Sequence, residues 1–312
     1  MKTLIRVTEI WVPNKTRTHL EFFDGLYGEL AEFKGTSESM RFAWDEGLPG
    51  KAWAARKPII LHRFENSYFL RTEAAHQAGL TAAIALPIFA GDYLQAVIVF
   101  FIGEDAENVG GIEIWSHQPG EENDIGMADG YYGSAESFEW TARHTRFRRG
   151  FGLPGTVWES GMPVIMDNLL SSKRTLRRDS DVRVGVSKGV GIPCSFNEQQ
   201  VLVMTFLSAL GTPIARRFEI WTPTEDGQAL RFGVGDCDQV SDLGSLHAAA
   251  RIAPWQGALG ETWQKGVPAV RASLADEGSP AGAAAIASGL SSMVVVPVIQ
   301  EGRFRAAVAW YF

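Results

Sequence analysis

The chain has 312 residues, a length that predicts two or three domains. Hydrophobic residues make up 46% of it and charged residues 21%, which is typical of a globular protein and excludes a disordered or collagen-like chain. The net charge is −7, so a nucleic-acid partner would need a local basic stretch. The densest such stretch, Arg143 to Arg149, is interpreted as a solvated loop, and we expect no nucleic-acid partner.

Cysteine usage and hydropathy indicate the compartment. Two cysteines can form neither a disulfide framework nor a four-thiolate zinc site, which favours a reducing, cytoplasmic environment. The N-terminus lacks the apolar stretch of a signal peptide. The longest uncharged run, Ala281 to Gln300, is long enough to span a bilayer, but its glycines, proline and serines predict a small-residue helix and then a buried strand. We therefore expect no membrane-spanning segment.

The sequence repeats itself three times, with a step of about 105 residues. A glycine-rich segment recurs with this step, at Gly47–Trp53, Gly152–Trp158 and, more weakly, Gly257–Trp263. A Glu-Ile-Trp triplet stands upstream of each copy, beginning at Glu9, Glu113 and Glu219. Such a period indicates one structural unit per repeat. We predict three domains, residues 1–103, 104–213 and 214–312, of which the third is degenerate and structural. The short connectors favour a rigid array.

Each repeat is predicted to open with the strand that carries Glu-Ile-Trp, followed by a polar turn. In the first repeat the later elements are, in chain order, a strand at Leu20–Phe23, a short helix at Lys51–Arg56, a strand at Pro58–Leu61, a helix at Tyr68–Ala78, and closing strands at Ala82–Phe89 and Leu94–Phe101. Helices mixed with antiparallel strands predict the α+β class.

The closing strands are apolar on both of their alternating faces. This holds for Ala96–Phe101, Val201–Leu207 and Ala306–Phe312. Continuous apolar runs are typical of strands that are buried on both sides. We therefore expect the backs of the three sheets to pack against one another or against a second chain, as tightly packed repeats or a homo-oligomer.

These motifs resemble the GAF domain family. The resemblance rests on the Gly-Leu-Pro-Gly turn, a tryptophan three residues later, a Lys-Pro or Met-Pro before a strand, and an Ala-Gly-Leu followed by a run that ends in Ala-Leu-Pro. In the first repeat it covers residues 46–101, and it is weaker in the other two. It implies three tandem GAF-like domains, each an antiparallel sheet with short helices on one face, a ligand pocket and a sensory role. The flanking amphipathic helices usual in the family are not expected here, because the connectors are short.

Candidate binding residues stand where the repeats differ. The position four residues after the first recurring proline of each repeat holds His62, Asp167 or Ala272, and the position sixteen residues before the second recurring proline holds Arg71, Arg177 or Ala281. An anionic small molecule would suit Arg71 or Arg177, and the third repeat has lost both polar groups. The alternative is that both arginines are solvated helix residues. The candidate ligand-binding residues are Trp44, His62, Arg71, Phe147, Asp167, Arg177 and Cys194.

No pattern points to a cofactor. The six histidines show no metal-ligand spacing, neither cysteine has the neighbour that a covalent bilin requires, and haem is not expected. The recurring glycines lack phosphate-loop spacing and are interpreted as backbone turns. One enzyme family with this fold reduces free methionine sulfoxide with cysteines, but Cys194 and Cys237 lie in different repeats.

We therefore predict a cytoplasmic, non-enzymatic sensory or regulatory protein. It would bind a small molecule in GAF-like pockets and signal through contact with a separate output protein. One alternative is a structural or protein-interaction module whose pockets are filled by its own side chains. A second alternative is a cysteine-based methionine sulfoxide reductase.

Overall fold

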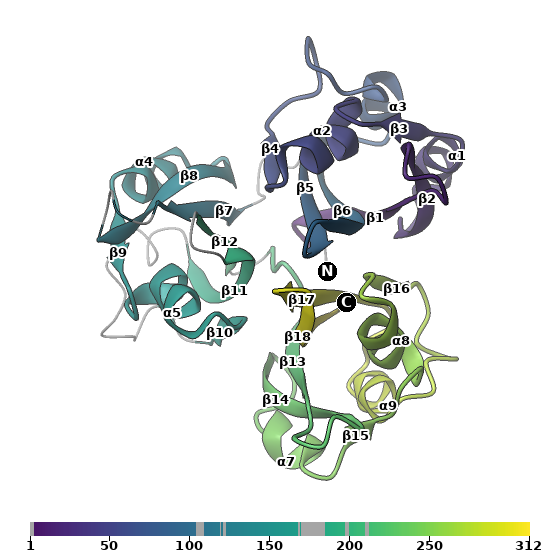
Figure 1. Cartoon of the computed structure of the whole chain (residues 1–312), viewed down its shortest axis with the longest axis vertical. Helices are drawn as coiled ribbons and strands as arrows, with labels where there is room; N and C mark the ends of the chain where they lie inside the picture. The colour runs from purple at the N-terminus through teal and green to yellow at the C-terminus, as the bar shows by residue number, and fades with distance from the viewer. Residues whose placement is uncertain are drawn as a thin grey trace.

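The structure is a computed structural model that describes residues 3–103, 109–118, 120, 123–167, 169, 185–196, 200–209 and 212–312. Three antiparallel sheets of six strands, each formed by a consecutive part of the chain, surround a common centre (Figure 1). The predicted α+β class and the three tandem sheets with short helices are confirmed. The domain limits at residues 103 and 213 stay a prediction.

The first sheet has the strand order β3-β2-β1-β6-β5-β4. Its strands are β1 (Ile5–Pro13), β2 (His19–Leu26), β3 (Arg41–Ala43), β4 (Ile59–Leu61), β5 (Leu80–Ala90) and β6 (Tyr93–Gly103). Its helices are α1 (Ala31–Glu38), α2 (Gly47–Ala55) and α3 (Thr72–Gln77). The predicted elements are found in the predicted order, with the polar helix shorter than expected. Helix α1 and strand β3, which lie between β2 and α2, were not predicted.

The other two sheets have equivalent orders, β10-β11-β12-β7-β8-β9 and β15-β14-β13-β18-β17-β16. The second contains β7 (Val109–His117), β8 (Asp124–Gly133), β9 (Arg146–Arg148), β10 (Val164–Met166), β11 (Val186–Phe196) and β12 (Val201–Ala209), with α4 (Glu136–Arg143) and α5 (Gly152–Ser160). The third contains β13 (Arg217–Pro223), β14 (Leu230–Cys237), β15 (Arg251–Ile252), β16 (Ala269–Arg271), β17 (Met293–Gln300) and β18 (Arg303–Tyr311), with α7 (Leu243–His247), α8 (Gly257–Lys265) and α9 (Pro280–Ala287).

The recurring glycine motif begins the equivalent helices α2, α5 and α8. Its first glycine has a left-handed φ of 58° to 64° in all three copies, a conformation that favours glycine. A Cβ on its second glycine would overlap a backbone carbonyl oxygen, that of Ala43, Arg148 or Ala253. The two glycines are therefore required by the backbone conformation, which agrees with the prediction that the motif forms a turn.

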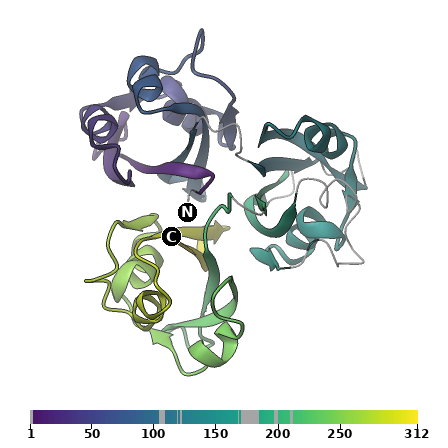
Figure 2. The same ribbon diagram turned by 180° about the vertical axis from the view of Figure 1, so that it is seen from behind.

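The inner faces of the three sheets share one hydrophobic core. Three aromatic rings, one from each repeat, meet in it: Phe100 stacks on Trp310 at 5.2 Å between ring centroids, and Phe206 lies 4.6 Å from Trp310 and 5.6 Å from Phe100. All three side chains are fully buried. Of the two predicted arrangements, packing of the sheets against one another or against a second chain, the structure shows the first. Seen from behind, the helices again lie outside this centre (Figure 2).

The repeats close into a ring through three equivalent seams. Strand β4 lies against β8, β10 against β14, and β16 against β2. The backbone nitrogen of Leu4 also donates to the carbonyl of Pro213 at 3.0 Å, which ties the first strand to the segment before the third sheet.

The uncharged run near the C-terminus forms α9 and then β17, as predicted. Within the described part of the chain, no helix has the length and apolar character needed to cross a membrane.

Candidate functional site

A fully buried glutamate lies at the same place on the first strand of each sheet. Glu9, Glu113 and Glu219 each accept a hydrogen bond at 2.9 Å from the indole nitrogen of the tryptophan two residues further on. In each repeat a tyrosine hydroxyl donates to the same carboxylate at 2.8 to 3.0 Å, from Tyr27, Tyr132 and Tyr311. A buried carboxylate is costly unless it is paired and hydrogen-bonded. The Glu-Ile-Trp triplet therefore organises a polar cluster inside each repeat.

In the first repeat the partner of this carboxylate is Arg71, which immediately precedes α3. Its guanidinium donates to Oε1 of Glu9 at 2.6 Å and to Oε2 at 2.9 Å, a bidentate ion pair. The hydroxyl of Ser37 in α1 donates to Oε1 at 2.7 Å. Arg71 is 4% exposed, so the alternative that it is a solvated helix residue is wrong.

Aromatic rings enclose the Arg71 guanidinium. Five ring centroids lie 4.9 to 5.8 Å from its central carbon, those of Trp11, Phe33, Phe42, Phe69 and Phe101. Cation–π attraction adds to the ion pair in such a place. The interior of the first repeat is thus occupied by its own side chains.

In the third repeat the cation comes from a different place in the chain. Arg217, on the same strand as Glu219, donates through its Nε to the carboxylate at 2.7 Å, and Nε2 of His247 in α7 lies 2.8 Å from the same oxygen. Both Arg217 and Glu219 are fully buried. The third repeat has alanine at the position equivalent to Arg71, and the sequence therefore predicted that its cation was lost. The structure shows instead that Arg217 supplies the cation.

The electrostatics of this cluster favour the charged pair. Burial alone would raise the pKa of Glu219, but the hydrogen bond from His247 and the charge of Arg217 hold it below its ordinary value. Burial, with the adjacent carboxylate, raises the pKa of Tyr311 well above its ordinary value. The hydroxyl therefore stays a neutral donor to an ionised glutamate.

In the second repeat, Thr205 Oγ1 donates to Glu113 at 2.8 Å, beside the tryptophan and tyrosine donors. The candidate Arg177 lies outside the described residues. Sequence reasoning missed all three glutamates as functional positions. The available signal was a charged residue that recurs at the centre of an otherwise apolar strand.

The structure does not bring the predicted binding residues together. Trp44 is exposed beside Trp53, with ring centroids 5.2 Å apart, and Phe147 is buried under Trp115 at 5.0 Å. His62 lies at the seam between the first two repeats, where its Nε2 is 3.1 Å from Oδ1 of Asp129. The other two described candidates lie elsewhere, Asp167 exposed after β10 and Cys194 in β11, near the C-terminal end of that strand.

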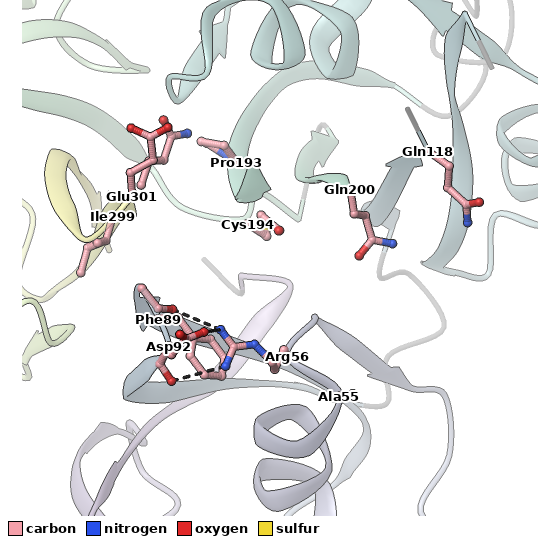
Figure 3. Close-up of a pocket in the computed structure, with 13 residues that line it drawn as sticks. Ala55, Arg56, Phe89, Asp92, Gln118, Pro193, Cys194, Gln200, Ile299 and Glu301 are labelled. Atoms are coloured by element: carbon pink, nitrogen blue, oxygen red, sulfur yellow. Dashed lines mark hydrogen bonds and ion pairs between the residues drawn. The ribbon is translucent and has the colours of Figure 1, made fainter. Parts of the chain in front are cut away.

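Where the closing hairpins of the three repeats meet, the chain forms a cavity of about 630 Å³ (Figure 3). We call it the junction cavity. Its apolar lining consists of Ala55 and Phe89 from the first repeat, Pro193 from the second and Ile299 from the third. Its polar lining consists of Arg56, Asp92, Gln118, Cys194, Ser195, Gln200, Gln300 and Glu301. Small-molecule sites are concave and combine apolar surface with polar groups, and the lining of the junction cavity is the more polar variant of this pattern.

The charged groups at the junction cavity are partly compensated. The Arg56 guanidinium donates to Oδ1 of Asp92 at 3.2 Å and to the carbonyl of Gly91 at 3.1 Å, and it lies over the Phe89 ring at 4.3 Å. Among the described residues, no basic side chain pairs with Glu301. One carboxylate is therefore in excess at the cavity, which disfavours an anionic occupant.

Cys194 is the thiol of the junction cavity. Burial raises the pKa of this thiol to about 12, so it is protonated at neutral pH. A protonated thiol is a poor nucleophile. Within the described part of the chain, no group of three or more histidine, cysteine or acidic side chains could hold a metal ion.

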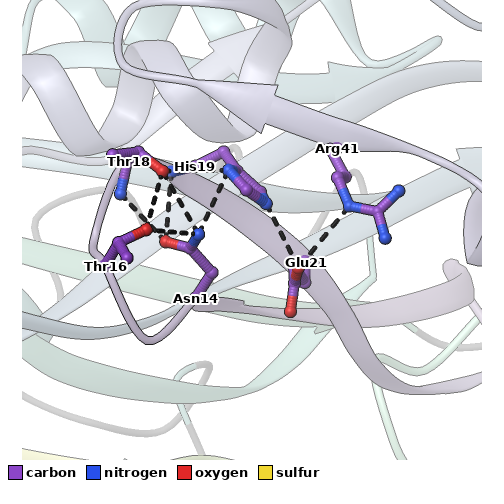
Figure 4. A network of polar contacts seen from close by, with 6 residues as sticks. All are labelled: Asn14, Thr16, Thr18, His19, Glu21 and Arg41. Atoms are coloured by element: carbon purple, nitrogen blue, oxygen red, sulfur yellow. Dashed lines mark hydrogen bonds and ion pairs between the residues drawn. The ribbon is translucent and has the colours of Figure 1, made fainter.

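A second polar network, at the β1–β2 turn, has a structural explanation (Figure 4). The side chain of Asn14 accepts from the backbone of Thr18 at 2.9 Å and donates to Thr16 at 2.8 Å, as expected of a turn-forming asparagine. Oε1 of Glu21 lies 3.1 Å from Nε2 of His19 and 3.5 Å from Nε of Arg41. These contacts fix the hairpin and its edge strand.

About a third of the chain, the length of one repeat, is similar to solved structures that include several GAF domains. One is the nlh2 GAF domain of A. aeolicus in an inactive state, with 21% identity, 32% of this chain and 59% of that one covered, and a TM-score of 0.26. Another is the free methionine-R-sulfoxide reductase of Neisseria meningitidis, with 11% identity, 33% and 57% covered, and a TM-score of 0.26.

A third similar structure is the Staphylococcus aureus NreA protein mutated in its nitrate-binding site, with 17% identity, 35% and 78% covered, and a TM-score of 0.27. The chain spans less than two thirds of the length of the first two structures. No protein-family model matches the chain, and no curated protein matches it.

Proposed function

We propose that the chain is a non-enzymatic regulatory protein that binds a small molecule in the junction cavity and passes on its occupancy through protein contacts. The observation that carries this proposal is the position of the cavity. Its walls come from all three repeats, whereas the interiors of the first and third repeats are occupied by ion pairs of the protein itself.

A ligand in the junction cavity would contact the closing hairpins of all three repeats at once. A ligand that binds the closed ring and not an open or unfolded state stabilises the closed ring by mass action. Occupancy would then change how firmly the three repeats hold together. The proposed cytoplasmic protein could report this change to a separate output protein.

The charges around the cavity favour a neutral or cationic ligand with an apolar face. The expectation of an anionic ligand depended on Arg71 and Arg177. Support from Arg71 is lost, because the Glu9 carboxylate already neutralises its guanidinium. At the junction cavity Arg56 is paired with Asp92, and the carboxylate of Glu301 remains.

The chemistry of Cys194 argues against the alternative of a cysteine-based reductase. Attack on a sulfoxide needs a thiolate and a second thiol in reach. The Cys194 thiol is held protonated, and Cys237 is buried in the third repeat, at the end of β14. A module that binds no ligand is the second candidate, favoured by the filled interiors of the first and third repeats.

The test is native mass spectrometry of the protein after incubation with the small-molecule fraction of a cell extract. Ala55 is exposed and lines the cavity, so Ala55→Trp should fill it. Ala283→Trp changes an exposed alanine of α9 and is the matched control. We expect bound mass in the wild type and the control, and none in Ala55→Trp. Bound mass that persists in Ala55→Trp would rule out this site, and none in any protein would favour the ligand-free module.

A further inference from the structure

A second concave surface lies on the outer side of the first repeat, away from the junction cavity. Helices α1 and α3 lie side by side there (Figure 1) and enclose a groove of about 390 Å³. We call it the outer groove. Its apolar lining consists of Leu30, Ala31, Phe33, Ala74 and Ala78, and its polar lining of Glu29, Glu32, Thr36 and Gln77.

Two carboxylates of the outer groove are open to a partner. Glu29 and Glu32 are exposed, and among the described residues no basic side chain pairs with either of them. The other carboxylates of these helices are engaged. Glu38 pairs with Lys34 at 3.7 Å, and Glu73 accepts from Gln77 at 2.8 Å. The groove therefore combines an apolar floor with two uncompensated negative charges on one edge.

The buried ion pair holds the two walls of the groove. Ser37 of α1 donates to Glu9, and Glu9 pairs with Arg71 at the start of α3. Phe33, on the groove floor, packs on the Arg71 guanidinium at 4.9 Å and on the Phe101 ring at 5.2 Å. Both helices are thus joined to the same buried glutamate, and the groove is preformed.

We propose that the outer groove binds a cationic amphipathic helix of a partner protein. The apolar face of such a helix would cover the groove floor, and its lysine or arginine side chains would meet Glu29 and Glu32. An amphipathic helix in a groove between helices is a recurring mode of recognition. Charge complementarity at the edge selects the partner and its orientation. An anionic helix or a nucleic acid would be repelled by the same two carboxylates.

The probe is a fluorescein-labelled 18-residue helix with leucine on one face and lysine elsewhere, and binding is followed by fluorescence anisotropy. We compare the wild type with Glu29→Gln/Glu32→Gln, which removes both charges without changing the shape. Glu225→Gln/Asp276→Asn removes two exposed carboxylates of the third repeat and is the charge-matched control. Thr36→Trp fills the groove.

We expect Glu29→Gln/Glu32→Gln to raise the Kd by about 3- to 10-fold, since each exposed charge pair contributes modestly. The control should leave the Kd within about 1.5-fold, on the same reasoning. Thr36→Trp should abolish binding while its melting curve stays cooperative. The cavity variant Ala55→Trp should bind the peptide as the wild type does, which separates this proposal from that of the junction cavity.

Several results would overturn the proposal. A peptide with glutamate in place of lysine that binds equally well would exclude charge recognition. An equal loss in the control would show attraction to net charge alone. Binding that survives Thr36→Trp would place the peptide elsewhere, and an absence of binding to the wild type would exclude the groove as a docking site for such a helix.

Discussion

Arg217 in the third repeat performs the role that Arg71 performs in the first. Each guanidinium neutralises the buried glutamate of a Glu-Ile-Trp triplet, but Arg71 is 62 residues from its partner and Arg217 only two. The first and third repeats thus share a cation at this carboxylate, and different segments of the chain supply it. An ionised glutamate in a low-dielectric interior is unstable without one.

We predict that Arg71→Met lowers the free energy of unfolding by about 3–5 kcal/mol, because it leaves the Glu9 carboxylate buried and unpaired. The double variant Glu9→Gln/Arg71→Met should be more stable than the single one, because it removes the orphaned charge as well. Urea denaturation measures both. Arg303→Met, at an exposed position, is the control. A double variant no more stable than Arg71→Met would show that the charge pair is not the cause.

The seam between the first two repeats should respond to pH through His62. The hydrogen bond to Asp129 raises the pKa of His62 above its ordinary value of 6.5, against a smaller opposite effect of burial, and the charges of Glu139 and Arg143 act in opposite directions. Because the folded pKa is raised, the stabilisation is fully present below about pH 6.5 and is lost as the pH rises through the folded pKa.

The measurement compares the melting temperatures of the wild type and His62→Asn between pH 5 and pH 9. The wild type should be the more stable protein at low pH, and the difference should vanish at high pH. The effect should be small, since the pair is half exposed. A difference that does not change with pH, or that grows as the pH rises, would contradict the assigned partner.

The limits of sequence reasoning follow from where each feature is encoded. The repeat, the glycine turns and the back-to-back sheets are local patterns or simple consequences of burial, and they could be predicted. The exchange of Arg71 for Arg217 could not, because a side chain from another segment reaches the same point in space. The junction cavity could not either, because turns from three repeats create it only after the ring has closed.

We predict that Cys194 is slow to react. Its pKa of about 12 against an ordinary 9.0 reduces the thiolate at neutral pH about 1,000-fold. In a Cys237→Ser background, labelling with a disulfide reagent at pH 8 should be far slower in the folded protein than in urea. The protein should also show no turnover of free methionine sulfoxide that Cys194→Ser abolishes. Fast labelling together with such turnover would restore the reductase alternative.

The shared core predicts that the three repeats unfold together. Trp310 contacts Phe100 and Phe206 of the other repeats, so Trp310→Ala leaves a cavity on all three sheets at once. Large-to-small changes of this kind cost about 3–5 kcal/mol. Trp310→Phe should cost less, because it keeps a ring and removes an indole nitrogen that has no hydrogen-bond partner among the described residues.

Scanning calorimetry distinguishes a shared core from three separate ones. The wild type should give one transition, and Trp310→Ala should shift that whole transition to a lower temperature. If the repeats were independent units, Trp310→Ala would split off a transition of the third repeat and leave the rest in place. A single shifted transition would also mean that a ligand bound at the junction can act on every repeat, because all three then share one folding equilibrium.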